Sequence, residues 1–281
     1  MSQKSKFLKY LFALLMFFFF IACKQKLSNV AEIEAKLSYT TDSVVAYDPH
    51  CKLLNTDKEQ CSYIKMRYPK FAGSNSEFLN KEVSKLVCSA PYLIQQNGKQ
   101  FSATSITNLP QEFFAQRNGD LNEQIKKGEL DKESLDQILL NWFVDGQVNA
   151  DTILNKFITL SFYQYTFQGG THGSYFTEYH HIDYRNQKPL SLSDFLKNTS
   201  DTITLKKIAK ENGVWLNAEN KPSFFEGEKK FYINYNNFYF NTQGIVFKYQ
   251  VYEIGAFAEG SFDLLIPFSK LNGILKTEML E

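Results

Sequence analysis

Three of the chain's four histidines lie in one segment, residues 163–181, with the sequence YQYTFQGGTHGSYFTEYHH. Zinc hydrolases use histidine and carboxylate ligands that converge on one ion and leave a position open for water. His180 and His181 are neighbours on an expected strand, so their side chains point to opposite faces. His172 could still converge with His180 or Asp183 across a hairpin. No HExxH motif is present, so we expect no metal and no cofactor, and a hydrolase built from those three side chains is the alternative.

The glycines of the same segment favour a structural explanation. Gly169, Gly170 and Gly173 surround Thr171 and His172 between two expected strands. Glycine permits a positive φ or a close approach of other groups at a bulged turn. We expect His172 to hydrogen-bond the backbone and hold this turn. A binding role for residues 169–173 is the remaining interpretation.

A second candidate site lies near the C-terminus, in the segment VYEIGAFAEGSFD. Between residues 249 and 269 the chain carries Glu253, Glu259 and Asp263 and no basic residue. Together with Tyr252 these are candidate binding residues, because an acidic loop favours a basic partner electrostatically. A solvated loop without a partner is the alternative. We expect no catalytic residues, since the chain has neither a Gly-x-Ser-x-Gly turn nor a phosphate-binding glycine loop.

Residues 1–22 are typical of a bacterial lipoprotein signal peptide. Three lysines form a basic flank, a mostly apolar stretch too short to span a bilayer comfortably follows, and it ends directly before Cys23. The pattern resembles a lipobox, in which the cysteine is lipidated and becomes the N-terminus. Acyl chains would then anchor the protein to a membrane. The alternative is an uncleaved anchor helix.

The charge of the chain gives no sign of a nucleic-acid partner. Removing the three lysines of the signal peptide from 31 basic residues leaves 28 against 30 acidic ones, which takes the formal charge from +1 to about −2. No basic block remains to contact phosphates. With 43% hydrophobic and 16% aromatic residues, the rest of the chain is expected to be globular.

The cysteines fit a compartment that tolerates disulfides. Cys51 and Cys61 flank the polar segment KLLNTDKEQ, which is expected to be a loop between two strands, so we expect them to pair. Cys88 lies in a helical pattern and is expected to be a buried free thiol.

Hydrophobic periodicity predicts both helices and strands. Residues 23–42 are polar and are expected to be a tether. The expected helices cover residues 74–87, 130–145 and 200–212, the second with Gly146 just past its end. The expected strands cover residues 42–53, 61–71, 156–167 and 174–184, with several more between 229 and 267. This order favours an α+β fold with two mainly antiparallel-sheet subdomains and packed helices.

Several segments, in this order, resemble a known pair of extracytoplasmic modules. IKMRYPKFAGSNSEFLNKEV (64–83), YTFQGGTHG (165–173) and KPLSLSDFL (188–196) are similar to parts of the N-terminal module of PdaC-type peptidoglycan deacetylases. The segment from Thr242 to Leu271 resembles the adjoining domain of unknown function. The same pair forms the outer part of lysozyme-sensing anti-sigma-V factors. The resemblance implies a first module over residues 43–185 and a second over 186–281.

The resemblance also implies a function. It points to a non-enzymatic, membrane-anchored lipoprotein that binds a protein or glycan ligand, either a lysozyme-like muramidase or peptidoglycan. The protein would face the periplasm or the cell surface of a bacterial cell envelope. The motifs of the deacetylase catalytic domain are absent from the chain. The alternatives are an envelope hydrolase that uses the His172 region and a scaffold or assembly lipoprotein.

Overall fold

The structure, a computed structural model, describes residues 37–54, 61–89, 102–140, 142–154, 156–168, 171–216 and 231–280. Cys23, the expected signal peptide and most of the expected tether lie outside these ranges, so lipidation remains a prediction. None of the helices within the described ranges is long and apolar enough to cross a membrane.

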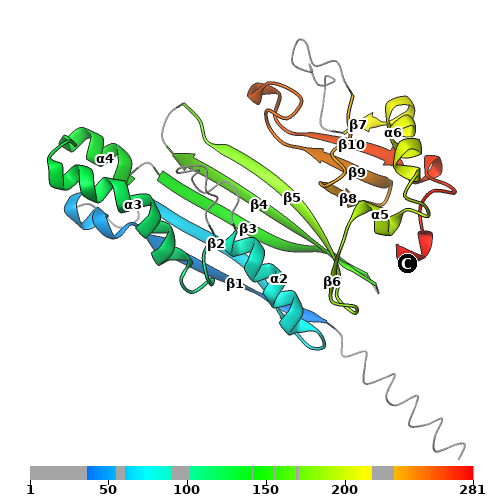
Figure 1. Cartoon of the computed structure of the whole chain (residues 1–281), viewed down its shortest axis with the longest axis horizontal. Helices are drawn as coiled ribbons and strands as arrows, with labels where there is room; N and C mark the ends of the chain where they lie inside the picture. Colours follow the sequence, from blue (N-terminus) through cyan, green and yellow to red (C-terminus); the bar gives the residue numbers. More distant parts are fainter. Residues whose placement is uncertain are drawn as a thin grey trace, which may run out of the picture.

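The N-terminal part of the chain forms a six-stranded sheet (Figure 1). Its strands are adjacent in chain order: β1 (Ser38–Tyr47), β2 (Tyr63–Ala72), β3 (Trp142–Ile153), β4 (Ile158–Gln168), β5 (Ser174–Asp183) and β6 (Lys188–Leu190). All neighbours are antiparallel except β2 and β3, which are parallel. A parallel pair needs a long crossover, and here the crossover contains α2 (Ser76–Cys88), α3 (Leu109–Lys127) and α4 (Lys132–Leu140).

The crossover helices cover one face of this sheet. Leu79, Val83 and Val87 of α2 are buried against strand residues such as Ile64 and Leu160. Burial of each such side chain contributes about 1.5–3 kcal/mol. The helix α3 has a proline in its first turn and ends at Gly128, whose φ is 67°. Its phenylalanines extend the same core.

The C-terminal part forms a second, four-stranded antiparallel sheet in the order β7-β10-β9-β8. The strands are β7 (Val214–Trp215), β8 (Phe238–Phe240), β9 (Gly244–Tyr249) and β10 (Phe262–Pro267), and the helices are α5 (Leu192–Phe195) and α6 (Asp201–Asn212). Short 3-10 helices complete the chain: η1 (Pro49–Leu54), η3 (Phe257–Glu259), η4 (Phe268–Lys270) and η5 (Thr277–Met279). Each sheet has its own hydrophobic core. The fold is therefore α+β with two mainly antiparallel sheets, as expected.

Two expected boundaries were wrong. The predicted helix through Trp142 ends at Leu140, and Trp142 begins β3. Gly146 is no helix cap but a buried strand residue, where a Cβ would lie 2.5 Å from Met66 Sδ. Every second residue, Val144, Gly146 and Val148, is buried, which is the pattern of a strand and not of a helix. Pairing with β2 and β4 stabilises the strand conformation here.

The expected tether is also shorter than predicted, because β1 begins at Ser38. Its first residues pair with the end of β2, from Lys70 to Ala72. They are exposed on an edge strand, so hydrophobic periodicity gives no signal there. The first sheet likewise extends past residue 185, since β6 pairs with β5.

The cysteines behave as expected. Cys51 and Cys61 form a disulfide that closes the connection between β1 and β2, and both are buried. Cys88 is a buried free thiol at the end of α2. Burial raises the pKa of the Cys88 thiol. This thiol is therefore an inert core group.

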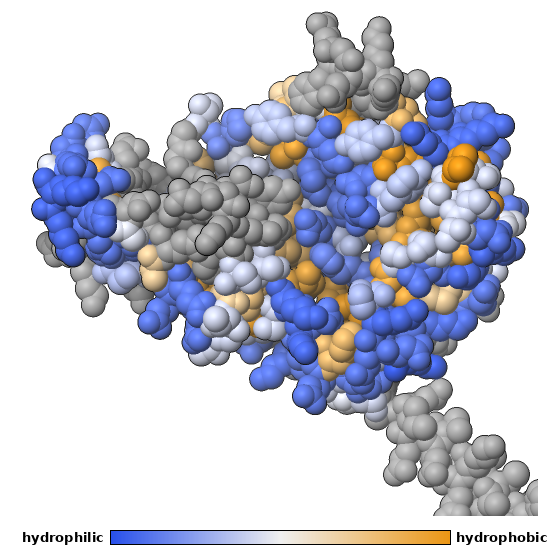
Figure 2. Space-filling model, viewed as in Figure 1, coloured by the Kyte–Doolittle hydropathy of each residue, from blue (hydrophilic) through white to orange (hydrophobic). Residues whose placement is uncertain are grey.

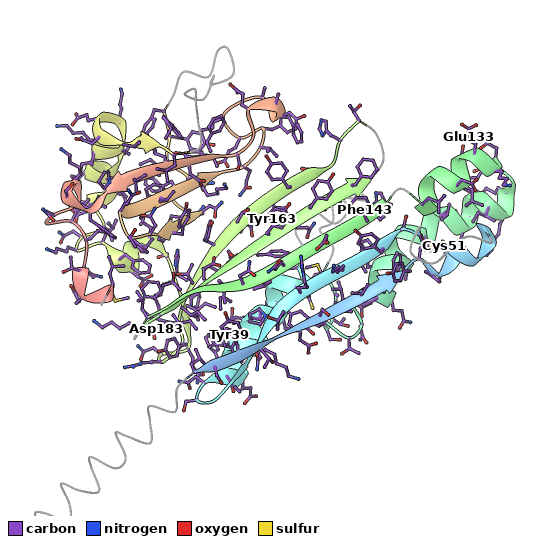
Figure 3. All side chains as sticks on the ribbon, turned by 180° about the vertical axis from the view of Figure 1, so that it is seen from behind. Tyr39, Cys51, Glu133, Phe143, Tyr163 and Asp183 are labelled. Carbon is purple, nitrogen blue, oxygen red and sulfur yellow. A yellow bond between two sulfur atoms is a disulfide. The ribbon has the colours of Figure 1, made fainter. Side chains whose placement is uncertain are left out.

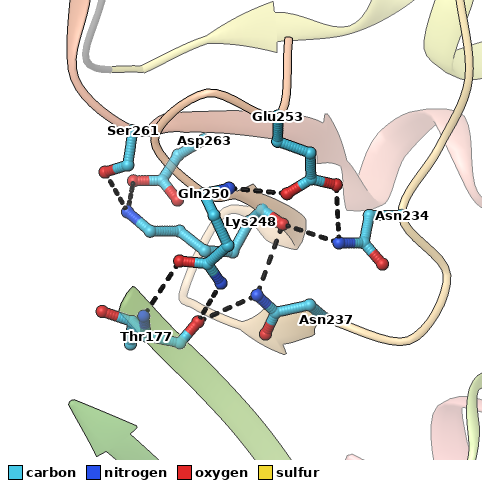
Figure 4. Close-up of polar contacts among 8 residues, drawn as sticks. All are labelled: Thr177, Asn234, Asn237, Lys248, Gln250, Glu253, Ser261 and Asp263. Atoms are coloured by element: carbon cyan, nitrogen blue, oxygen red, sulfur yellow. Dashed lines mark hydrogen bonds and ion pairs between the residues drawn. The ribbon is translucent and has the colours of Figure 1, made fainter. Parts of the chain in front are cut away.

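The two sheets meet at the open edge of β5. Thr177 N donates to Gln250 Oε1 (3.0 Å), and Gln250 Nε2 donates back to Thr177 O (2.6 Å). Tyr179 N donates to Asn237 Oδ1 (3.1 Å). Asn237 Nδ2 donates to Thr177 O (2.9 Å), and Figure 4 shows this bond beside the two contacts of Gln250. Side-chain amides of the C-terminal part therefore satisfy backbone groups that a neighbouring strand would otherwise pair.

His181 joins the two sheets beside this edge. It is 3% exposed, its Nε2 donates to Phe238 O (2.9 Å), and its Nδ1 accepts from Thr159 Oγ1 (3.0 Å). Phenylalanine rings surround the imidazole: Phe157, Phe195, Phe238 and Phe240. Burial, which disfavours the charged form, lowers the pKa of His181 to about 4.

We predict that His181 makes the protein less stable in mild acid. The unfolded chain binds a proton at this histidine near pH 6.5, whereas the folded chain does so only near pH 4. Full stability is present above about pH 6.5 and is lost as the pH falls toward 4, by on the order of 3 kcal/mol. Urea unfolding at pH 7.5 and pH 4.5 measures this loss.

The His181→Gln variant is expected to lose much less stability over the same pH interval, because glutamine does not titrate. His180→Gln is the matched control: it removes the neighbouring histidine, whose charge lowers the pKa of His181 less than burial does, so the variant should keep most of the wild-type pH dependence. Equal pH dependence in the wild type and His181→Gln would contradict the prediction.

Candidate functional site

The two candidate segments of the sequence lie against each other. His172, in the turn between β4 and β5, stacks on Phe257 of η3, with ring centroids 3.8 Å apart and an interplanar angle of 14°. His172 Nδ1 lies 3.0 Å from Gly173 O, which is the backbone hydrogen bond that the sequence led us to expect. From the sequence we expected two separate candidate sites. The contact between His172 and Phe257 joins them into one.

Gly173 is required by a close approach. A Cβ at this position would lie 2.4 Å from the ring of Tyr165 and 2.8 Å from Thr166 O. Tyr165 therefore lies directly on the glycine backbone. Thr171 is exposed beside it, whereas Gly169 and Gly170 lie outside the described residues.

Two tyrosines complete an aromatic cluster with His172 and Phe257. Tyr252 lies 5.4 Å from Phe257 between ring centroids, and Tyr175 lies 6.2 Å from it in an edge-to-face arrangement. Tyr252 has a positive φ of 64° and is 54% exposed. A tyrosine held in this backbone conformation with its ring in solvent is a typical contact residue for a ligand.

The residues of the alternative hydrolase site do not converge. Asp183 accepts from Asn186 N (2.9 Å) and Nδ2 (2.8 Å) and closes the turn after β5. His180 Nε2 lies 3.5 Å from Glu178 Oε2. Ser174 to Asp183 is one extended strand, which places His172 roughly 30 Å from Asp183. No group of three or more His, Cys, Asp or Glu side chains within the described ranges could hold a metal ion.

The acidic loop was wrongly expected to present three charges to solvent. Asp263 is 6% exposed, and its Oδ2 lies 3.3 Å from Lys248 Nζ (Figure 4). Lys248 comes one residue before the sequence window that contained no basic residue. Glu253 is half-buried and accepts from Gln250 N (2.6 Å) and Asn234 Nδ2 (2.9 Å). Only Glu259 is exposed, and it accepts from Ala256 N at the start of η3.

A pocket of about 570 Å³ lies between β5 and the C-terminal part. Amides, rings and carboxylates line it, among them His180, Asn234, Asn236, Gln250, Tyr252 and Glu253. A second pocket of about 340 Å³ shares Tyr179, His180 and Asn236 with the first and reaches Lys85 of α2. Together they form a groove along β5, which we name the junction groove. Tyr252 connects it to the aromatic cluster.

The junction groove suits a ligand with many hydroxyl or amide groups. Amide side chains both donate and accept, and so do hydroxyls. Asn236 is exposed, lines both pockets and makes no hydrogen bond with the described residues. Burial raises the pKa of Tyr179, so this phenol stays neutral. Sequence reasoning missed Asn234, Asn236 and Asn237, although NYNN between two aromatic runs was a visible signal.

Comparison with known families identifies two modules in the chain. Residues 55–175 match the family model described as Deacetylase PdaC, and residues 185–269 match the model described as a protein of unknown function, DUF3298. The chain is a two-module PdaC–DUF3298 protein. His172 belongs to the PdaC module and Phe257 to the DUF3298 module, so the aromatic cluster spans their junction.

Two solved structures share the fold of this PdaC–DUF3298 protein. A DUF3298 family protein from Pseudomonas aeruginosa is 15% identical, with a TM-score of 0.55, over 88% of this chain and 98% of that chain. A DUF3298 family member from Bacteroides fragilis is also 15% identical, with a TM-score of 0.53, over 85% of this chain and 93% of that chain. No curated protein sequence matches the chain. At this level of identity the likeness shows the fold alone.

We predict that Gly173→Ala destabilises the protein by about 1–3 kcal/mol, because the new methyl group would force Tyr165 and the turn apart. Gly119→Ala is the matched control. No atom lies within 4 Å of a Cβ there, and alanine in the interior of α3 should stabilise by about 0.5–1 kcal/mol. Thermal unfolding of both variants tests the contact, and equal stability of Gly173→Ala and the wild type would contradict it.

Proposed function

We propose that this PdaC–DUF3298 protein is a lipid-anchored, non-enzymatic protein of the bacterial cell envelope that binds a glycan, with peptidoglycan as the ligand class. The observation that carries the proposal is the junction groove, a polar pocket of about 570 Å³ with an exposed tyrosine at its rim. Pockets between modules are common ligand sites. Amides for hydroxyl groups and rings for the apolar faces of sugars are the groups that a glycan requires.

The charges favour a glycan over a basic muramidase. Electrostatic attraction of a basic protein requires acidic groups at the surface. Asp263 is paired with Lys248, and Glu253 is occupied by hydrogen bonds from its own module. Glu259 alone offers an exposed carboxylate in this segment. A muramidase or a purely structural partner is therefore an outcome that the binding experiment must distinguish.

Separate roles for the candidate catalytic residues support a non-enzymatic function. His172 stacks on Phe257, His180 pairs with Glu178, and Asp183 closes a turn. The family model is described as a deacetylase, but these three side chains share no reacting centre in the structure. No described contact favours the hydrolase, so binding without chemistry is the function proposed.

The anchor is tested through Cys23. We expect Cys23→Ser to prevent incorporation of a palmitate analogue and to release the protein into the soluble fraction, because the acyl chains supply the membrane affinity. Cys88→Ser is the matched control, since that thiol is buried in the fold. Cys88→Ser should leave labelling unchanged. Labelling that persisted in Cys23→Ser would contradict lipidation at Cys23.

Ligand binding is tested by sedimentation with insoluble peptidoglycan. We expect Tyr252→Ala and Asn236→Ala each to weaken binding about tenfold, or ~1.4 kcal/mol, because they remove a ring and an unpaired amide from the groove. Tyr39→Ala is the matched control, with a tyrosine that is 44% exposed on β1. Titration with lysozyme in parallel separates a protein ligand from a glycan. Equal sedimentation of the wild type and both groove variants would refute the site.

A further inference from the structure

The described elements cover the two faces of the six-stranded sheet differently. The helices α2 and α3 pack on the face that holds Ile64, Val144 and Phe162. The opposite face carries Phe143 and Tyr163 (Figure 3), and the C-terminal part covers its β5 end, where His181 contacts Phe195 of α5. We call the rest of this face, on which no described helix packs, the bare face. On the side seen in Figure 2, hydrophilic residues cover the α3–α4 end, whereas apolar residues emerge mainly over the DUF3298 module. A sheet face in contact with water is normally polar, whereas aromatic rings interrupt the polar residues of the bare face.

A row of aromatic rings crosses the bare face at one end. Tyr47, Tyr63, Phe143 and Phe167 are consecutive cross-strand partners on β1, β2, β3 and β4. Their centroids are 6.2 Å apart for Tyr47 and Tyr63, 5.3 Å for Tyr63 and Phe143, and 5.5 Å for Phe143 and Phe167. All four are half-buried, so one side of each ring contacts solvent. We name these four residues the ring row.

The ring row is continuous with the candidate site. Phe143 lies 5.7 Å from Tyr165, which pairs with Tyr175 on β5, and Tyr175 lies 6.2 Å from Phe257 of the aromatic cluster. At roughly 4.8 Å per strand, the path from β1 to β5 is about 19 Å long. That length accommodates several sugar units of an extended polymer. The rings therefore form one path from the far edge of the sheet to Tyr252.

Charges beside the ring row favour an anionic occupant. Lys65 and Arg67 of β2 lie on the bare face next to Tyr63. Arg67 Nη2 lies 3.5 Å from Asp145 Oδ1, which is the acidic residue facing them from β3. Lys65 makes no ion pair with the described residues. Lys65 is the cross-strand partner of Asp145, so Lys65 and Arg67 together against this one carboxylate leave a formal net charge of +1 on this part of the face.

We propose that the bare face of the PdaC module binds a carboxylate-bearing polysaccharide strand, with sugar rings stacked on the ring row and a carboxylate at Lys65. The proposal rests on the glycan-binding function above and extends it from the junction groove to a second, longer surface. Sugar rings have an apolar face of C–H groups and a polar rim, which matches half-exposed rings bordered by Lys65, Gln147 and Asn149. A second copy of this chain is disfavoured because it would bring two such positive faces together.

The test is equilibrium binding of the soluble, lipid-free chain to solubilised peptidoglycan strands, which carry carboxylates. A neutral chitin oligomer and polyglutamate serve as comparison probes. Phe143→Leu and Tyr63→Leu should each weaken binding to the peptidoglycan strands and to the chitin oligomer about fivefold or more. Lys65→Gln should weaken binding to the peptidoglycan strands and reduce its salt dependence, but should leave binding to the chitin oligomer unchanged, because that oligomer is neutral.

Matched controls come from the same sheet. Tyr39→Leu removes an exposed ring roughly 25 Å along β1 from Tyr47, and Lys70→Gln removes an exposed charge from β2. Neither should change binding. Tyr63→Leu keeps the test valid if Phe143→Leu fails to fold, as judged by circular dichroism and thermal unfolding.

Each result decides the proposal. Normal binding by Phe143→Leu, Tyr63→Leu and Lys65→Gln, with binding lost in Tyr252→Ala, would overturn the second surface and leave the junction groove in place. Loss in the ring-row variants alone would support this surface and refute the groove. Equal competition by polyglutamate would overturn the stacking role of the rings. Self-association that Phe143→Leu abolishes, without glycan binding, would assign the face to a second copy instead.

Discussion

Strand β5 has a neighbouring strand along most of its length on one side only, because the short β6 pairs with its last residues alone. Backbone groups at Thr177 and Tyr179 would otherwise be left without partners at a buried junction, at a cost of about 1–3 kcal/mol each. Gln250 and Asn237 supply those partners through their side chains. This edge fixes where the DUF3298 module sits on the PdaC module.

The remaining features of the junction follow from that docking. His181 is sealed among phenylalanines because the second sheet covers the end of β5, and its pKa falls to about 4 as a result. The same docking places the turn between β4 and β5 beside η3, so that His172 stacks on Phe257. The junction groove is the space left where the amide contacts hold the two modules together but do not fill the gap. A displaced module would lose the site as well as the contacts.

Local patterns predicted much of the fold. The Cys51–Cys61 bond, the buried Cys88, the strands β4 and β5 and the α+β class all followed from spacing and periodicity. Hydrophobic spacing gave the wrong element at Trp142, because this residue fits the helical period of the α4 residues before it and also the strand period of the β3 residues after it. It also failed at the exposed start of β1, where no face is buried and no pattern is required.

The sequence by itself determined which residues are available for contact: the aromatic side chains, the glycine turn, the histidines and the expected lipid anchor. Tertiary structure alone decided which of them meet. Asp263 became a buried ion-pair partner because β9 and β10 lie side by side and bring Lys248 to it. Tyr47, Tyr63, Phe143 and Phe167 became one row only through the register of four strands. Such contacts join residues tens of positions apart, and the energy that selects them comes from burial and backbone pairing summed over both sheets rather than from any local segment.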